Sequence, residues 1–294
     1  MPGAVYVNGR VTGEADAVVP VFDHGFLYGE GVYEVCRTYG GRLRLLPRHL
    51  ARLRASAALI ALPVPLDDAA LEARINETLT AAELTPWREG LPDAYVRLLL
   101  TRGVGELSYD PRACPTPTLV IIARPHTPPP PRVYEEGVEV ALVDIERNRR
   151  EALNPQIKSN NLLNNALAMQ QALARGAFEA VMRNHEGHLA ECSQSNLFVI
   201  IGGVVCTPPI GEGLLPGITR AFVLELCDAL GMAADECVLD DDGLTQADEA
   251  FLTSTTREIV PIVRVDGRDV GSGRPGPVTR RLLTAFRTRV VTAV

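Results

Sequence analysis

Lys158 is the residue in this sequence that is best suited to covalent chemistry. The chain has 29 lysine and arginine residues together, and Lys158 is its only lysine. Arginine stays protonated, whereas a lysine amine can be deprotonated by its surroundings and attack a carbonyl group. We therefore expect Lys158 to form a Schiff base. The alternative is a GC-rich genome that has replaced lysine with arginine and left one lysine without a role.

Three other features could bind an anionic or aromatic ligand. Glu191 follows an apolar pair at the end of an expected strand and precedes small polar residues. The turn 211–218 leads into an expected helix over 219–230, and free N–H groups at a helix start suit a phosphate. An ordinary cap by Thr219 is the commoner outcome of such a turn. Four hydroxyl residues, 253–256, follow another expected strand and form either a turn or a second anion clamp.

Charge and hydropathy exclude some partners. The 294-residue chain has a formal net charge of -7 and a pI near 5.4, which argues against nucleic acid as its main partner. It contains no apolar run long enough to span a bilayer and no signal-peptide pattern at the N-terminus. Its six cysteines form no Cys-x-x-Cys motif, so we expect reduced thiols in a cytoplasmic protein.

The first part of the chain predicts strands and two helices. Asn8-Gly9 between alternating strand residues predicts a hairpin. Apolar residues at three- and four-residue steps predict a helix from Pro47 towards Pro63, and Asp67 is expected to cap the next helix.

A predicted strand over 94–103 carries two polar side chains on one face. Tyr95 and Arg97 share this face because side chains alternate along a strand. An arginine in so apolar a strand requires a partner, and a carboxylate is the obvious one.

Four consecutive prolines, Pro128–Pro131, predict a stiff spacer between two domains. We expect an α+β fold with a smaller N-terminal α/β domain over 1–124, a linker over 125–132 and a larger C-terminal domain over 133–294. In the larger domain, Lys158 precedes a helix over 161–175 and antiparallel strands follow. His185 and His188 straddle a turn without a third ligand nearby, so we expect no metal site.

One amine, one carboxylate, one helix start and one hydroxyl cluster are together what pyridoxal 5'-phosphate requires. The sequence resembles the class IV, fold-type IV pyridoxal-phosphate aminotransferases. That family includes branched-chain and D-amino acid aminotransferases, aminodeoxychorismate lyases and (R)-selective amine transaminases. The resemblance runs nearly end to end and rests on several motifs, namely 23–34, 48–53, 95–97, 102–105, 157–159, Glu191, 215–220 and 253–256.

The resemblance implies a fold whose larger domain holds a mainly antiparallel, barrel-like sheet flanked by helices. It implies that Lys158 carries the cofactor and transfers the proton, and that Glu191 pairs with the pyridine nitrogen. The other cofactor-binding residues that it implies contact the phosphate: Arg54, Ile218, Thr219, Ser254 and Thr255. The substrate residues that it implies are Tyr95, Arg97 and the amide of Thr256 at the carboxylate, with Tyr28 and Tyr33 at the side chain.

The family also implies a homodimer or higher assembly, with part of the pocket supplied by the neighbouring subunit. The expected substrates are an amino acid and a 2-oxo acid such as 2-oxoglutarate. Segments 23–31 and 95–107 resemble branched-chain enzymes. However, Leu162 stands where those enzymes have a tyrosine, and Tyr33-Glu34-Val35 and 253–256 also resemble D-amino acid aminotransferases. No match exists for an Arg-x-His carboxylate trap, since Leu99 follows Arg97.

We therefore expect a branched-chain-type transaminase. The alternatives are a D-amino acid aminotransferase and a lyase of the aminodeoxychorismate type, which needs no amino acceptor. A binding module without catalytic activity would require Lys158 to be incidental.

Overall fold

The structure, a computed structural model, describes residues 3–293, and these fall into two compact units. The first unit runs to Thr127 and also takes in Ile157–Asn161 and the chain end from Val290. The second unit comprises Pro128–Gln156 and Leu162–Arg289. Each unit has its own sheet and its own apolar core.

A six-stranded antiparallel sheet forms the first unit, in the order β2-β1-β6-β5-β3-β4. Its strands are β1 (Ala4–Val7), β2 (Arg10–Gly13), β3 (Gly31–Tyr39), β4 (Arg42–Leu43), β5 (Ala94–Thr101) and β6 (Thr118–Pro125). Asn8 and Gly9 both have positive φ, at 45° and 98°, as a two-residue hairpin turn requires. The predicted N-terminal hairpin is confirmed.

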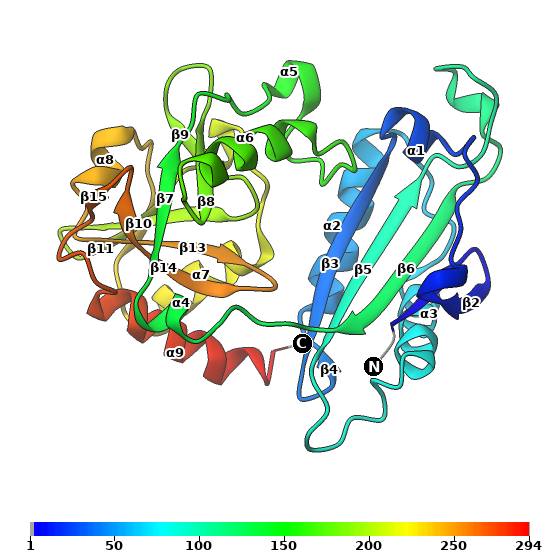
Figure 1. Cartoon of the computed structure of the whole chain (residues 1–294), viewed down its shortest axis with the longest axis horizontal. Helices are drawn as coiled ribbons and strands as arrows, with labels where there is room; N and C mark the ends of the chain where they lie inside the picture. Colours follow the sequence, from blue (N-terminus) through cyan, green and yellow to red (C-terminus); the bar gives the residue numbers. More distant parts are fainter. Residues whose placement is uncertain (1–2, 294) are drawn as a thin grey trace. The chain divides into compact units, whose positions relative to one another are not determined.

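Two helices cover one face of this sheet (Figure 1). They are α2 (Leu46–Leu59) and α3 (Asp68–Ala81), and the Asp67 side chain accepts from the Ala70 amide at 2.8 Å, which confirms the predicted cap. A short helix, α1 (His24–Tyr28), precedes β3 and is capped by Asp23. The 3-10 turns are η1 (Glu14–Asp16) and η2 (Pro111–Ala113).

The second unit contains a nine-stranded mixed sheet in the order β12-β11-β10-β13-β14-β7-β8-β9, with β15 paired to β14. Its strands are β7 (Val138–Leu142), β8 (Glu179–Arg183), β9 (Leu189–Cys192), β10 (Asn196–Ile201), β11 (Val204–Thr207), β12 (Ala234–Glu236), β13 (Glu249–Ser254), β14 (Glu258–Val265) and β15 (Arg268–Asp269). The pairs β11/β12, β14/β7 and β7/β8 are parallel and the other pairs are antiparallel, as the expected mainly antiparallel sheet requires.

Helices pack on this sheet and on one another. They are α4 (Arg132–Glu135), α5 (Arg150–Leu153), α6 (Leu163–Ala174), α7 (Ile218–Ala229), α8 (Asp241–Thr245) and α9 (Pro277–Val290), with η3 at Ile210–Glu212. Phe222 of α7 meets Phe286 of α9 edge to face, with ring centroids 5.5 Å apart. None of the helices within residues 3–293 is long and apolar enough to cross a membrane.

The segment 157–161, which carries Lys158, is bound to the first unit although the sequence places it after the prolines. The Tyr33 amide donates to the Lys158 carbonyl at 2.9 Å, and the Asn160 amide donates to the Gly31 carbonyl at 2.9 Å. The Lys158 amide donates to Oγ of Ser56 on α2 at 3.1 Å. These bonds fix the backbone of Lys158 against the start of β3.

Candidate active site

The side chain of Lys158 lies on an aromatic ring of β3. Its Nζ is 4.5 Å from the centroid of the Tyr33 ring, and the guanidinium carbon of Arg97 is 4.2 Å from the same centroid. Arg97 reaches this ring from β5, where it pairs with Val35 in the register. Within the first unit, the structure therefore brings together an amine and a guanidinium that the sequence separates by about sixty residues.

Arg97 does not have the carboxylate partner that the sequence suggests. Among residues 3–293, no side chain forms an ion pair with it, and Tyr33 supplies a cation–π contact instead. Tyr95 is half-buried on the same face of β5. Tyr28 lies on α1, with its ring 5.1 Å from that of Tyr109. These side chains leave a carboxylate-binding cation available beside the aromatic residues.

A buried ionic network underlies this surface. Glu34 is fully buried and accepts hydrogen bonds from Arg52, at 2.6 Å from Nε and 2.9 Å from Nη2, while Nδ1 of His49 lies 2.7 Å from its Oε2. Burial alone would raise the pKa of Glu34, but Arg52 and His49 together hold it well below its usual value. Burial lowers the pKa of His49, and the hydrogen bond to Glu34 opposes this.

Lys158 is close enough to act on this network. Its charge is among the causes that lower the pKa of His49 and oppose the raised pKa of Cys36. The Glu34–His49–Arg52 network was not predicted from the sequence. The available signal was an ionised residue inside an apolar strand, together with a histidine and an arginine three residues apart on one helix face.

Arg54 lies elsewhere on α2. Its Nε donates to Asp68 at 2.7 Å and its Nη2 donates to the Leu66 carbonyl at 2.7 Å. Two residues along a helix differ by about 200° in direction, so Arg54 points away from the side that Arg52 shares with Ser56. The structure therefore places Arg52 on the side of α2 where the Lys158 amide bonds to Ser56, and it places the expected phosphate ligand Arg54 against the residues that lead into α3.

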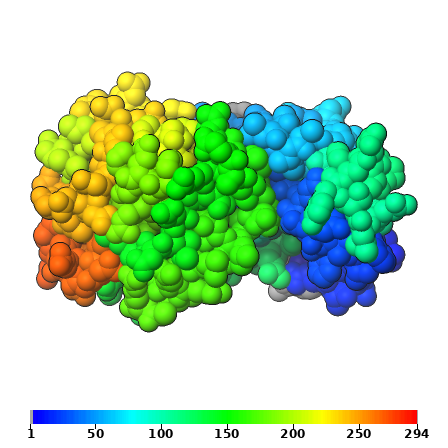
Figure 2. Space-filling view, turned by 90° about the horizontal axis from the view of Figure 1, so that it is seen from above, coloured from blue at the N-terminus to red at the C-terminus, as the bar shows by residue number. Residues whose placement is uncertain are grey.

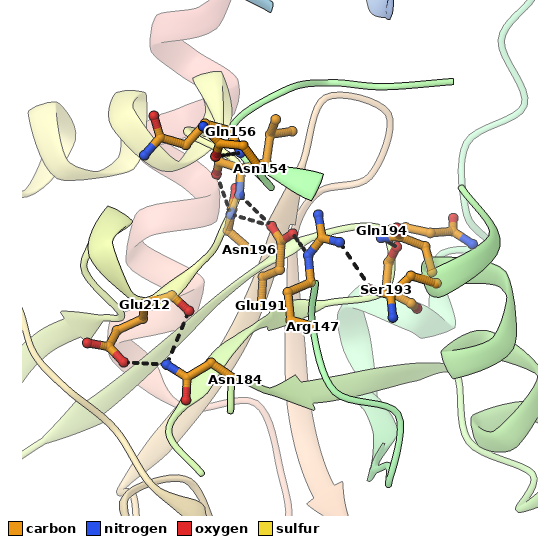
Figure 3. Close-up of polar contacts among 12 residues, drawn as sticks. Arg147, Asn154, Gln156, Asn184, Glu191, Ser193, Gln194, Asn196 and Glu212 are labelled. Carbon is orange, nitrogen blue, oxygen red and sulfur yellow. Dashed lines mark hydrogen bonds and ion pairs between the residues drawn. The ribbon is translucent and has the colours of Figure 1, made fainter. Parts of the chain in front are cut away.

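In the second unit, Glu191 is the centre of a hydrogen-bonded cluster (Figure 3). Its Oε1 accepts from Nε of Arg147 at 2.8 Å. Its Oε2 accepts from the Leu215 amide at 3.0 Å and from Nδ2 of Asn196 at 3.3 Å. Glu191 is 5% exposed. A carboxylate fixed by an arginine in this way suits a cationic ring nitrogen.

The same cluster holds the start of α7. Asn196 Nδ2 also donates to the Leu215 carbonyl at 3.0 Å, and a Cβ on Gly217 would collide with Asn196 Oδ1. Gly217 is the N-cap residue of α7, and no side chain caps the helix there. The amides of Ile218 and Thr219 therefore keep the donor character of a helix N-terminus.

The hydroxyl residues 253–256 end β13 and begin the tight turn to β14, and Arg257 contacts them. Arg257 Nε donates to Ser254 Oγ at 3.3 Å, and its Nη1 lies 2.9 Å from the buried Glu179. Thr253, which precedes Ser254, pairs with Asn196 in the sheet. The buried Oγ1 of Thr253 has no hydrogen-bond partner among residues 3–293. Ser254, Thr255 and Thr256 are all half-buried. Polar groups that lack a partner beside an uncapped helix start fit a phosphate ester.

Leu162 and His188, which also carry sequence-based expectations, both lie in the second unit. Leu162 is the N-cap residue of α6 and makes no side-chain cap bond, as expected for an apolar side chain. The expectation that no further possible ligand lies near His188 is wrong, since its Nδ1 lies 2.9 Å from Glu212 and 3.5 Å from Glu186. Asn184 Nδ2 also donates to Glu212 at 2.7 Å, so hydrogen bonds within the protein account for this grouping.

The fold and these side chains define a pyridoxal-phosphate enzyme of fold type IV. The family model for amino-transferase class IV matches residues 31–265. The chain is 39% identical over 283 residues to a putative branched-chain-amino-acid aminotransferase of Methanocaldococcus jannaschii, covering 96% of this chain and 95% of that protein. It is 35% identical to a D-alanine aminotransferase of Bacillus licheniformis, covering 98% of this chain and 97% of that protein.

Solved structures agree with these relatives. The branched-chain aminotransferase of Escherichia coli superposes with a TM-score of 0.93 at 30% identity, covering 99% of this chain and 96% of that chain. The branched-chain aminotransferase of Thermobaculum terrenum, solved in its PLP form, gives 0.86 at 28% identity, covering 100% and 95%. The chain belongs to the class IV aminotransferase family. It is a pyridoxal-phosphate-dependent aminotransferase.

Proposed function

We propose that this enzyme moves an amino group from a branched-chain amino acid to a 2-oxo acid such as 2-oxoglutarate. The observation that carries the proposal is the joint placement of Lys158 and Arg97 over the ring of Tyr33, at 4.5 and 4.2 Å. A transaminase needs an amine that handles the Cα proton and a cation that holds the substrate carboxylate. In the first unit, the amine of Lys158 and the guanidinium of Arg97 both contact the ring of Tyr33.

Lys158 is proposed as the catalytic residue. When bound, pyridoxal phosphate supplies the electron sink that makes the Cα proton of an amino acid acidic. Nζ of Lys158 then takes that proton from Cα as a general base and later delivers it as a general acid. Its backbone is fixed by bonds to Tyr33 and Ser56, which limits the side chain to a short path.

Several residues are proposed to bind the cofactor. Glu191, supported by Arg147, would hold the proton on the pyridine nitrogen. The amides of Ile218 and Thr219, the Thr219 side chain and the hydroxyls of Ser254 and Thr255 would bind the phosphate. We assign the arginine contact to Arg52 in place of Arg54, because Arg52 shares the side of α2 on which Ser56 accepts from the Lys158 amide.

Substrate binding is proposed to use Arg97 and Tyr95 at the carboxylate, with the amide of Thr256. Arg97 suits this role because the described residues give it an aromatic contact and no carboxylate. Tyr28 and Tyr33 would shape the side-chain pocket. Bound substrate would then lie between a cation and aromatic rings, which suits an apolar side chain on an anionic head group.

The test is a set of half-reactions followed by a full turnover. The holoprotein is mixed with L-leucine, D-alanine, D-glutamate or (R)-1-phenylethylamine, and the absorbance of the bound cofactor is recorded. We expect L-leucine to change the spectrum fastest and, with 2-oxoglutarate added, to yield glutamate. Preference for D-alanine would support the second candidate, a D-amino acid aminotransferase, which the 35% identity to the Bacillus licheniformis enzyme favours. Pyruvate from aminodeoxychorismate without an amino acceptor would instead identify a lyase.

A homodimer is part of the proposal. Two loops of the first unit expose apolar side chains, and they are joined by the bridge between Asp23 and Val104. Their exposed apolar residues are Val18, Val19, Val21, Phe22, Phe26, Val104, Leu107 and Tyr109. Figure 2 shows the teal segment around Leu107 at the surface beside the blue N-terminal residues. We call this set the loop patch, and a second copy of the chain is its proposed partner because exposed apolar side chains that gather on one surface mark protein–protein interfaces.

A further inference from the structure

Two cysteines mark the ends of one strand–helix–strand segment in the second unit. Cys206 lies in β11 and Cys237 directly follows β12, with α7 between the two strands. Cys206 pairs with Asp235 in the parallel register, and the Cys237 amide donates to the Thr207 carbonyl at 2.9 Å. Asp235 and Cys237 point to the same face of the sheet because side chains alternate. The two thiols therefore lie side by side on that face.

The two thiols share one packed region. Cys206 is part of the buried apolar cluster of the second unit, and the partly buried Cys237 packs against the same cluster. A disulfide requires the sulfurs to approach to about 2.0 Å, so one strand has to shift slightly. β12 can shift because it is a three-residue edge strand whose residues are all exposed.

A small reagent can reach the pair from solvent. Both cysteines line an open pocket of about 480 Å³, together with His188, Asp235 and Asp240. Cys237 is half-buried and Cys206 is 6% exposed. Burial and the neighbouring Cys237 raise the pKa of the Cys206 thiol to about 12, so Cys206 remains a thiol and Cys237 is the side chain placed to react first.

We propose that Cys206 and Cys237 are a modification site, where hydrogen peroxide converts the dithiol reversibly to a disulfide. The Cys237 thiolate attacks one peroxide oxygen, the O–O bond breaks, and hydroxide leaves and takes up a proton as water. Cys206 sulfur then attacks the sulfur of the Cys237 sulfenic acid, the S–O bond breaks, and the Cys206 proton leaves with hydroxide as a second water. Two thiols lose two electrons in total, and one peroxide becomes two waters.

The disulfide would link β11 to β12 and so close the chain segment that contains α7. Arg220 of α7 already ties the segment together, since its Nη2 donates to the Pro208 carbonyl at 2.9 Å and contacts Glu236 of β12. A covalent link between the same two strand ends restricts separation of β12 from β11 and reduces the entropy of the unfolded chain. The oxidised protein is therefore more stable to heat than the reduced protein.

The test uses the holoprotein and maps its thiols. The protein is treated with hydrogen peroxide, denatured, alkylated and digested, and the peptides are analysed by mass spectrometry. We expect the free thiols to fall from the six of the sequence to four, with one intramolecular link between residues 206 and 237 that dithiothreitol reverses. Retention of six thiols, a link to another cysteine or a link between two chains would overturn the proposal.

Matched variants separate the pair from the other cysteines. Cys237→Ser should abolish the link and any rise in thermal midpoint on oxidation, whereas Cys114→Ser should keep both, because Cys114 only donates to the Gly103 carbonyl. If Cys206→Ser fails to fold, peptide mapping of the wild type and of Cys237→Ser still decides. An equal rise in the thermal midpoint of oxidised Cys237→Ser would contradict the role given to the bridge.

Discussion

Glu34 holds Arg52 through two parallel hydrogen bonds, at 2.6 Å from Nε and 2.9 Å from Nη2. The carboxylate lies in β3 and the guanidinium on α2, so this bidentate pair joins the helix to the sheet beside Lys158. Arg52 and His49 hold the pKa of Glu34 below its usual value, although burial of the carboxylate acts in the opposite direction. Both stability and cofactor binding should depend on this pair.

Glu34→Gln should lower the free energy of unfolding by about 3 kcal/mol at pH 7, because it leaves the buried Arg52 charge uncompensated. The folded-state pKa of Glu34 is lowered, so its stabilisation is complete above the unfolded value near 4.5 and is lost as the pH falls towards the folded value. The gap between wild type and variant should therefore narrow below pH 4.5 in urea unfolding curves. The exposed Glu77→Gln is the control, and a gap that stays constant down to pH 3 would contradict this account.

Arg52→Gln should weaken binding of pyridoxal phosphate by about 10-fold or more, as expected for loss of a charged hydrogen bond to the phosphate. Arg54→Gln should change this affinity less than about 2-fold, since its partners are Asp68 and Leu66. Affinities for pyridoxal phosphate and for pyridoxal, which lacks the phosphate, are compared by fluorescence titration. Equal losses for both ligands in Arg52→Gln would indicate general damage to the fold, and a larger loss in Arg54→Gln would reverse the assignment.

Lys158→Ala should lose the absorbance of the lysine-bound cofactor and lower turnover by at least about 10²–10⁴-fold, the usual value of a positioned acid–base group. Lys158→Arg is the matched variant, because it keeps a cation over Tyr33 without a nucleophilic amine. Both variants should fold with the wild-type circular dichroism spectrum. Activity retained by either variant in single-turnover measurements would exclude Lys158 from the catalytic role.

Arg97→Gln should raise KM for carboxylate substrates by about 10-fold or more and should leave the response to (R)-1-phenylethylamine nearly unchanged, since that amine has no carboxylate. The comparison requires initial rates with L-leucine and half-reaction rates with the amine. Arg97→Lys should recover part of the loss because it restores the charge but not the fork geometry. If both substrates lose reactivity equally, Arg97 supports Tyr33 and does not bind the carboxylate.

Phe22→Glu combined with Leu107→Glu should convert a dimer to a monomer in analytical ultracentrifugation, because charges would replace two exposed apolar side chains of the loop patch. Val238→Glu is the control, since Val238 is 55% exposed in the second unit and outside the patch. A wild-type protein that sediments as a monomer at micromolar concentration, or a double variant that stays dimeric, would rule out this interface.

Local patterns determined much of the structure directly from the sequence. Asn8-Gly9 predicts its hairpin because few residue pairs accept positive φ twice, and Asp67 predicts a helix start because its carboxylate satisfies a free amide. The solitary Lys158 identified the candidate amine by composition alone. The hairpin and the cap depend on residues that are neighbours along the chain, and the amine depends on composition.

The tertiary structure decided which distant residues accompany that amine. The sequence offers Arg48, Arg52 and Arg54 on one helix, and periodicity cannot say which of them faces a loop a hundred residues further on. In the structure, the backbone of Lys158 bonds to Tyr33 and to Ser56, and Ser56 lies on the side of α2 that Arg52 shares. Arg97 likewise finds an aromatic ring where its strand suggested a carboxylate. Long-range contacts depend on how helices and strands pack against one another. The periodicity of apolar residues along a strand or helix shows which face is buried, but it does not show which element packs on that face.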